Sequence, residues 1–214
     1  MKYQVKEVLV LGDKIIGIIL SGGKSSRFGS PKAFARKDGK YFYQYSIDAM
    51  RNVVDSFIMV SNSTLKSKFL YEQEVNFAII TDKKEYEGLG PLAGIYSGME
   101  YIAGDWYMVS PIDVPFVNEN IFRSLLLHKD ENIDAIIPVV SGKIQPLLSI
   151  YHHRVKGLIQ LLLESNALSV QELLKKCKVK YVPMEEEKAF YNINRRSDYE
   201  KWIENEEKNE DGKC

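Results

Sequence analysis

Short apolar runs with almost no polar interruption recur along the chain, and they constrain its fold more than any other feature. The runs have the length of strands and span residues 15–20, 56–61, 77–81, 106–110, 134–140 and 147–151. Apolar runs without strict alternation are typical of strands in a sheet that is covered on both faces. Amphipathic stretches separate the runs, and strands that alternate with helices indicate βαβ units. The pattern therefore predicts an α/β domain with a twisted, mostly parallel sheet.

The amphipathic stretches supply the expected helices, at residues 42–53, 91–102, 118–128, 155–164, 170–177 and 197–206. Pro91 suits the first turn of its helix, and Asn118 is of a residue type that caps helix N-termini. A length of 214 residues, of which 45% are hydrophobic, suits a single domain. We assign the domain to residues 15–203, with an N-terminal extension at 1–14 and a polar tail at 204–214 that is expected to be disordered.

The charge balance and the cysteine content exclude several classes of function. The chain has 29 basic and 29 acidic residues, so it lacks the electrostatic footprint of a protein that binds nucleic acid. Its apolar runs are shorter than a membrane span, and its N-terminal stretch lacks the unbroken apolar core of a signal peptide. Two cysteines, Cys177 and Cys214, do not make a disulfide framework. The protein is therefore expected in the cytoplasm, with no nucleic-acid or membrane partner.

The first expected strand leads directly into a glycine-rich loop, Leu-Ser-Gly-Gly-Lys-Ser-Ser-Arg-Phe-Gly-Ser-Pro-Lys, at residues 20–32. Ligands of open α/β sheets bind beyond the carboxyl ends of the strands, where Gly22 and Gly23 would let backbone N–H groups approach an anion. Arg27 and Lys32 add positive charge for a phosphate. The loop matches neither the P-loop nor the dinucleotide-binding motif, so we interpret it as another kind of phosphate loop. The alternative is a surface turn in which the glycines serve only to reverse the chain.

The same loop resembles the signature LxGGxSxRxGxxK of the molybdenum cofactor guanylyltransferases, which are small, Rossmann-like, three-layer enzymes of the nucleotidyltransferase superfamily. Every fixed position is filled, by Leu20, Gly22, Gly23, Ser25, Arg27, Gly29 and Lys32. The resemblance extends from about residue 15 to about residue 203. It implies catalytic roles for Arg27 and Lys32, and nucleotide contacts at Leu20, Ser21, Gly22, Gly23 and Lys32. Relatives that use CTP usually carry Ala at the position of Gly22, so the resemblance favours a guanine nucleotide.

Two aspartates follow expected strands and match further positions of the family. Asp82 comes directly after the strand at 77–81, before Gly-Pro-Leu-Ala-Gly at 90–94, and the resemblance implies that it binds guanine. A carboxylate can accept hydrogen bonds from both N1–H and the exocyclic amine of guanine, a donor pair that adenine lacks. Asp113 lies between Pro111 and Pro115, and the resemblance implies that it holds Mg²⁺, which prefers carboxylate and phosphate oxygens. For both aspartates the alternative is a structural role in a turn or at a helix end.

Three asparagines complete the predicted contacts. Asn62 follows the strand at 56–61, where the family often has an asparagine that contacts the nucleotide, although a shift of one residue would make Ser61 the equivalent. An ordinary turn asparagine is the alternative for Asn62. Asn192 and Asn194 belong to a stretch that resembles the family pattern NINTPxDL, and both amides would lie on one face of an extended segment. Gln145 departs from the family, which often has His there, so no His-specific role is expected.

The resemblance implies a complete reaction, in which GMP passes from GTP to molybdenum-molybdopterin and pyrophosphate is released. The product would be the guanine dinucleotide form of the cofactor. Mg²⁺ would be the metal cofactor, and molybdoenzymes or other cofactor-biosynthesis proteins would be protein partners. Two alternatives stay open: a related nucleotidyltransferase that uses CTP or a sugar phosphate, and a non-catalytic nucleotide-binding module. The set of Arg27, Lys32 and Asp113 favours the enzyme, because a nucleotide sensor has no need of a metal ligand.

Overall fold

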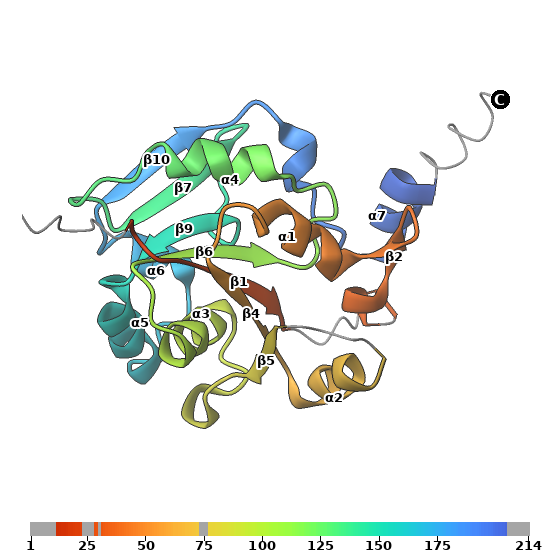
Figure 1. The fold of residues 1–214 in the computed structure, drawn as a ribbon, viewed down its shortest axis with the longest axis horizontal. Coiled ribbons are helices and arrows are strands. Elements are labelled where there is room, and N and C mark those ends of the chain that lie inside the picture. The colour runs from red at the N-terminus through yellow and green to blue at the C-terminus, as the bar shows by residue number, and fades with distance from the viewer. Residues whose placement is uncertain (1–11, 23–27, 30, 73–76, 205–214) are drawn as a thin grey trace, which may run out of the picture.

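The computed structural model describes residues 12–22, 28, 29, 31–72 and 77–204. Strands and helices alternate through most of these ranges (Figure 1). The strands are β1 Ile15–Ser21, β2 Arg36–Lys37, β3 Lys40–Tyr41, β4 Ser56–Ser61, β5 Ala78–Thr81, β6 Trp106–Pro111, β7 Ala135–Val140, β8 Lys143–Ile144, β9 Ser149–His152 and β10 Val179–Pro183. The helices are α1 Phe42–Met50, α2 Ser63–Glu72, α3 Pro91–Tyr101, α4 Glu119–Leu126, α5 Val155–Glu164, α6 Val170–Leu174 and α7 Arg196–Tyr199. Short 3-10 helices cover Lys32–Phe34, Lys84–Tyr86 and Glu187–Phe190, and a π-helical turn covers Glu200–Glu204.

The central sheet has the strand order β10-β7-β9-β6-β1-β4-β5, with the short strand β8 paired to β7. β1 runs parallel to both of its neighbours, β4 and β6, while β5 and β10 add parallel pairs toward the two edges. β8 and β9 run antiparallel to the strands beside them. The reversal of β9 has a simple cause: residues 141–148 join β7 to β9, and a parallel crossover needs about a dozen residues or more. The predicted α/β class and mostly parallel sheet are therefore confirmed, with an antiparallel element included.

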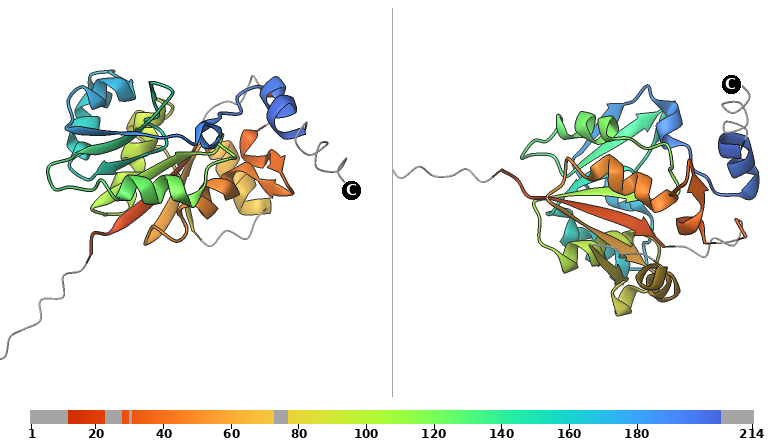
Figure 2. Two further views of the ribbon diagram at one scale, coloured as in Figure 1. Left: turned by 90° about the horizontal axis from the view of Figure 1, so that it is seen from above. Right: turned by 45° about the vertical axis from the view of Figure 1, so that its right-hand side comes forward.

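Helices cover both faces of the sheet, which gives three layers. α1 and α4 lie on one face, and α3 and α5 lie on the other (Figure 2). Successive residues of β1 point to opposite faces, because Ile19 joins the core beneath α1 and α4 while Ile18 joins the core beneath α3 and α5. Both side chains are fully buried, which explains why the strands read as continuous apolar runs. Among the helices in the described ranges, none is long and apolar enough to cross a membrane.

Several elements differ from the expectation. The sequence pattern does not predict α2, which leaves Tyr71 92% exposed and Leu70 60% exposed, so that its apolar residues form no single stripe. It also misses β10, an edge strand in which only Val182 is buried, and the small β2–β3 hairpin. The expected helix at 197–206 is instead the short α7 followed by the π-helical turn. The expected helices at 42–53 and 170–177 end earlier, at Met50 and Leu174.

The described chain is held to the domain near both of its ends. The Lys14 backbone N–H donates to Asp105 over 2.8 Å, and Asp13 forms an ion pair of 2.8 Å with Lys129. Near the other end, Ile203 is 1% exposed. Most of the expected extension and tail, residues 1–11 and 205–214, lies outside the described residues.

Candidate active site

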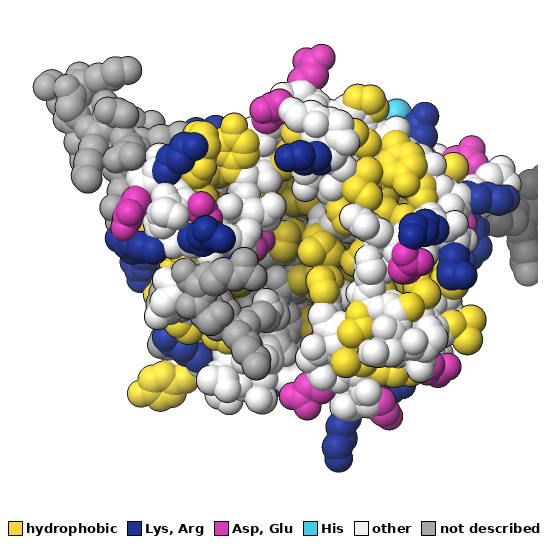
Figure 3. Space-filling view, turned by 180° about the vertical axis from the view of Figure 1, so that it is seen from behind, with side chains coloured by type: hydrophobic (Ala, Val, Ile, Leu, Met, Phe, Trp, Pro, Cys, Tyr) yellow, Lys and Arg dark blue, Asp and Glu magenta, His cyan; other side chains and the backbone are white. Residues whose placement is uncertain are grey.

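A pocket of about 700 Å³ opens at the carboxyl ends of β1, β4, β5 and β6. The chain runs from β1 through α1 to β4 on one side, and from β5 through α3 back to β6 on the other. Strand order therefore reverses next to β1, which is where open α/β sheets bind ligands. A hollow with apolar side chains is visible in the space-filling view (Figure 3). The volume lies within the usual range for small-molecule sites, about 300–1,000 Å³.

Most of the residues predicted from the sequence meet at this pocket. Those that line it are Leu20, Gly22, Lys32, Asn62, Asp82, Asp113, Asn192 and Asn194. Ser21 is buried at the end of β1, with 1% of its surface exposed. Gly23 and Arg27 lie outside the described residues. The pocket thus brings together the described members of the predicted set, while their roles stay predictions.

One end of the pocket is organised around Lys32. Its ammonium group donates to Asp113 Oδ2 over 3.1 Å and to Asn194 Oδ1 over 2.6 Å. The Lys32 and Asp113 side chains are only 13% and 21% exposed. The backbone also fixes this arrangement, because the N–H of buried Ile193 donates to the Asp113 carbonyl over 2.8 Å. The Asn194 amide, the Asp113 carboxylate and the Lys32 ammonium are therefore held together as one polar group.

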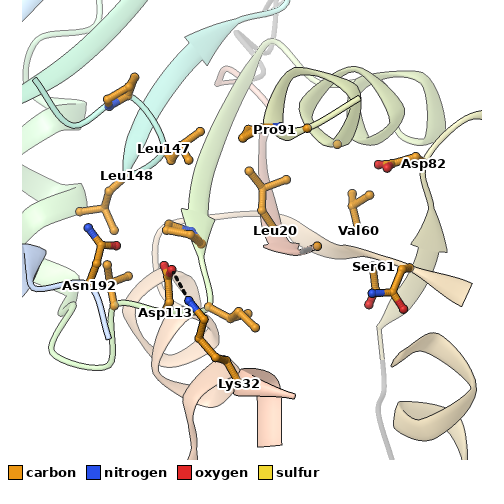
Figure 4. A pocket seen from close by; sticks show the side chains of 18 of the residues that line it. Leu20, Lys32, Val60, Ser61, Asp82, Pro91, Asp113, Leu147, Leu148 and Asn192 are labelled. Carbon is orange, nitrogen blue, oxygen red and sulfur yellow. Dashed lines mark hydrogen bonds and ion pairs between the residues drawn. The ribbon is translucent and has the colours of Figure 1, made fainter. Parts of the chain in front are cut away.

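Asp82 lies at the other end of the pocket, with Leu20 between it and Asp113 (Figure 4). Its Oδ2 accepts the Gly88 N–H over 3.2 Å and closes the turn that follows β5. Burial raises the pKa of the Asp82 carboxyl above its ordinary value, the Gly88 N–H acts against this rise, and the nearby Glu87 charge adds to it. Asp82 can stabilise this turn and bind a ligand at the same time, because a carboxylate can accept more hydrogen bonds than the one from Gly88.

Gly94 explains how helix α3 comes so close to this end of the pocket. A Cβ atom there would lie 2.8 Å from Leu20 Cδ2 and 3.8 Å from Asp82 Oδ1. The first distance is far inside van der Waals contact, so any larger residue would push α3 or Leu20 away. The Gly-Pro-Leu-Ala-Gly sequence thus allows the N-terminus of α3 to lie beside Asp82.

Asn62 and Ser61 differ in their hydrogen bonds. Asn62 Oδ1 accepts the Leu65 N–H over 2.9 Å and caps α2, which supports the turn alternative without removing Asn62 from the pocket lining. Ser61 also lines the pocket and is 3% exposed. Its hydroxyl and that of Ser21, its register neighbour on β1, have no hydrogen-bond partner within the described part of the chain. Buried polar groups are rarely left unsatisfied, so these two hydroxyls, which are buried at the carboxyl ends of β1 and β4, call for a partner beyond the described residues.

The remaining wall comes from a segment that sequence reasoning did not assign to the site. Residues 145–148, which connect β8 to β9, line the pocket together with Phe190 from a 3-10 helix. In Figure 4 Leu147 and Leu148 lie on the same side of the pocket as Asn192. The sequence signals here were the expected strand at 147–151 and the departure from the family at Gln145, and neither predicts a pocket lining. This wall is mostly apolar, with Gln145 as its polar member.

The charges of the pocket are unequal. Among the lining residues that the structure describes, Lys32 stands against three carboxylates, those of Asp82, Glu87 and Asp113. A phosphorylated ligand would therefore need positive charge beyond that of the described lining residues. A divalent cation could provide it at Asp113, because Mg²⁺ is commonly held by one or two carboxylates together with phosphate oxygens and water. The described residues contain no cluster of three or more His, Cys, Asp or Glu side chains that would hold a metal without such a ligand.

Known proteins resemble this chain in sequence. Residues 17–180 match the family model of the MobA-like NTP transferase domain. A probable molybdenum cofactor guanylyltransferase from Bacillus cereus is 42% identical over 190 residues, which cover 87% of this chain and 94% of the relative. A protein with the same description from Bacillus anthracis is 42% identical over 190 residues, with the same two coverages of 87% and 94%.

Solved structures share the fold. Molybdopterin-guanine dinucleotide biosynthesis protein A from Archaeoglobus fulgidus has a TM-score of 0.76 and 22% identity, over 90% of this chain and 99% of that one. The manganese complex of Rv0371C from Mycobacterium tuberculosis has a TM-score of 0.68 and 12% identity, over 89% of this chain and 98% of that one. At these identities the likeness concerns the fold alone.

Proposed function

Because the chain belongs to the molybdenum cofactor guanylyltransferase family of MobA-like NTP transferases, we propose that it transfers GMP from GTP to molybdenum-molybdopterin and releases pyrophosphate. The protein is a nucleotidyltransferase. The observation that carries the proposal is the layout of one pocket, with Asp82 at one end and the Lys32–Asp113–Asn194 group at the other. This layout suits a ligand that has a base at one end and phosphates at the other.

In the proposed reaction, a phosphate oxygen of the pterin forms a bond to the α-phosphorus of GTP. The bond from that phosphorus to the bridging oxygen of the β-phosphate breaks, and pyrophosphate leaves. The attacking phosphate is already ionised at neutral pH, so no general base is needed, and catalysis consists of positioning and charge neutralisation. Lys32 would neutralise charge on the departing pyrophosphate, and Arg27 would assist it. Asn192 and Asn194 would face the second substrate.

Asp113 would hold the divalent metal, which we propose to be Mg²⁺. When bound, the ion supplies positive charge between the two phosphorylated substrates and lowers their repulsion. The charge imbalance among the described lining residues supports this assignment, and so does the manganese in the related fold of Rv0371C. Lys32 would then exchange its contact with Asp113 for one with the phosphates of the nucleotide.

The proposal includes a cytoplasmic location, with the two substrates as ligands and molybdoenzymes or cofactor-biosynthesis proteins as partners. The cysteine content supports a reducing compartment. Cys177 is a free thiol, and burial raises its pKa to about 11. It therefore stays protonated and unreactive at neutral pH.

Guanine selectivity is expected to depend on Asp82. Asp82→Asn should weaken GTP binding by about tenfold or more, because hydrogen bonds to a charged acceptor contribute about 1.5–3 kcal/mol. CTP binding should change little. Titration calorimetry with GTP and CTP on both proteins measures this. Tighter binding of CTP than of GTP by the wild type, or an unchanged preference in Asp82→Asn, would refute the guanine assignment.

The same carboxyl gives the binding a pH dependence. The acceptor role needs the ionised form, and burial raises the pKa of Asp82 above its ordinary value. GTP affinity should therefore fall as the pH is lowered through that raised pKa, at a higher pH than for an exposed aspartate. Asp82→Asn should lack this component. The variant should also be at least as stable as the wild type at neutral pH, because the ionised form of a carboxyl whose pKa is raised costs stability above that pKa.

Ser61 is expected to donate its hydroxyl, which has no partner among the described residues, to the nucleotide. Ser61→Ala should weaken GTP binding by about fivefold, the effect of one lost hydrogen bond, without lowering the melting temperature of the unliganded protein. Ser110→Ala is the matched control, since Ser110 is fully buried and donates to Ser46 Oγ over 3.0 Å. That variant should melt at a lower temperature and bind GTP normally. The assignment fails if Ser61→Ala melts earlier and binds GTP as well as the wild type does.

A further inference from the structure

Helix α7 and the turn after it pack against the segment that carries Lys32. Phe28, Phe42, Ile193 and Ile203 form a small hydrophobic cluster of their own, with Tyr199 and Trp202 against it. Phe28 is 7% exposed, and Phe42 is fully buried. The cluster joins the C-terminal part of the domain to residues that precede and follow Lys32. Figure 1 shows α7 beside β2, far along the chain from it.

Tyr199 makes the contacts that matter for Lys32. Its ring meets the edge of Phe28 at 5.9 Å and stacks with Phe42 at 6.1 Å. Its hydroxyl donates to the Arg36 carbonyl over 2.6 Å. Phe28 precedes Lys32 in the chain and Arg36 follows it, so Tyr199 contacts the segment on both sides of the lysine.

The same C-terminal segment also receives the Lys32 side chain. Asn194 Oδ1 accepts from the ammonium group over 2.6 Å. Asp198 in turn accepts the backbone N–H groups of Asn194 and Arg195 over 2.9 and 2.8 Å. Tyr199 is the next residue, so one short helix orients both the acceptor of the lysine and the backbone that bears it.

We propose that Tyr199 is a positioning residue for Lys32, through its ring on Phe28 and above all through its hydroxyl on the Arg36 carbonyl. The inference rests on the proposed role of Lys32 in neutralising the pyrophosphate. A lysine ammonium is a point charge on a flexible stem, so its effect depends on how well its backbone is fixed. Displacement of a catalytic group by about 1 Å can cost about a hundredfold in rate.

The decisive variant is Tyr199→Phe, which keeps the ring against Phe28 and Phe42 and removes the hydroxyl that donates to the Arg36 carbonyl. In the otherwise wild-type protein it should lower kcat about fivefold and weaken pyrophosphate binding, measured by calorimetry, by a similar factor. In the Lys32→Ala background the same change should alter kcat and pyrophosphate affinity less than about twofold, because coupled residues are not additive. Tyr181→Phe, at a tyrosine 47% exposed on β10, is the control and should leave kcat and pyrophosphate affinity unchanged.

Equal fold losses in both backgrounds would overturn the inference, since they would mean that Tyr199 acts independently of Lys32. An unchanged kcat and pyrophosphate affinity in Tyr199→Phe would overturn it as well. These failures are distinct from a failure of the proposed function. A failure of the proposed function would appear as no pyrophosphate release by the wild-type protein, and a failure of the proposed role of Lys32 would appear as normal turnover in Lys32→Ala, before Tyr199 is changed.

Discussion

Asp113→Ala is expected to abolish metal-dependent turnover, with a loss of more than about a hundredfold in kcat. Asp113 follows β6 and lies beside Lys32 at the end of the pocket proposed for the phosphates, opposite Asp82. Without the Asp113 carboxylate, the metal has no charged protein ligand in the described part of that end. The attraction that should offset the repulsion between two anionic substrates is then lost. Pyrophosphate release across a series of Mg²⁺ concentrations measures the effect.

Two further variants test whether that loss of turnover is due to the charge of Asp113 in particular. Asp113→Asn keeps the size of the side chain and removes its charge, so it should be nearly as impaired as Asp113→Ala if charge is what matters. Asp130→Ala removes an exposed carboxylate that accepts the Asn132 N–H, and it should leave kcat unchanged. Full Mg²⁺-dependent turnover in Asp113→Ala would exclude Asp113 as the metal ligand.

Lys32→Ala should lower turnover about a hundredfold or more, the usual effect of losing a donor that stabilises charge in the transition state. Lys32 is the cation among the described lining residues, and it is held within reach of Asp113 and Asn194. Its loss removes the charge that would meet the departing pyrophosphate. The measurement is kcat with both substrates saturating, so that weaker binding does not mask the effect on the chemical step.

Lys32→Arg keeps the positive charge and changes its shape, so it should recover only part of the activity. Lys40→Ala removes an exposed lysine whose ion pair with Asp48 contributes little, and it serves as the control for a general loss of charge. Turnover near the wild-type value in Lys32→Ala would contradict the phosphate role of this lysine.

The fold was predictable where burial on both faces leaves a direct mark on the sequence. β1, β4 and β6 are covered by helices on each side, so Ile18 and Ile19 are both apolar although they face different cores. β10 and α2 carry no such mark, because an edge strand and a helix with exposed Leu70 and Tyr71 have mixed patterns. The direction of β9 was not predictable from its apolar run, since it depends on the length of the connection from β7.

The site was predictable where its residues follow strands. Lys32, Asp82 and Asp113 were found from their positions near strand ends and from the family resemblance. The Ser61 hydroxyl, which has no partner in the described part of the chain, was not predictable, because whether a buried serine has a partner depends on every element around it. The positioning role proposed for Tyr199 was not predictable either, because its contacts with Phe28 and Arg36 join residues far apart in the chain.

The most direct test of the proposed function is pyrophosphate release by the wild-type protein, supplied with Mg²⁺, GTP and molybdenum-molybdopterin. The expected result is one pyrophosphate for each guanine dinucleotide cofactor formed, with no release when either substrate is left out and little release when CTP replaces GTP. Release that is faster with CTP, or no release when both substrates are present, would contradict the proposed guanylyltransferase activity.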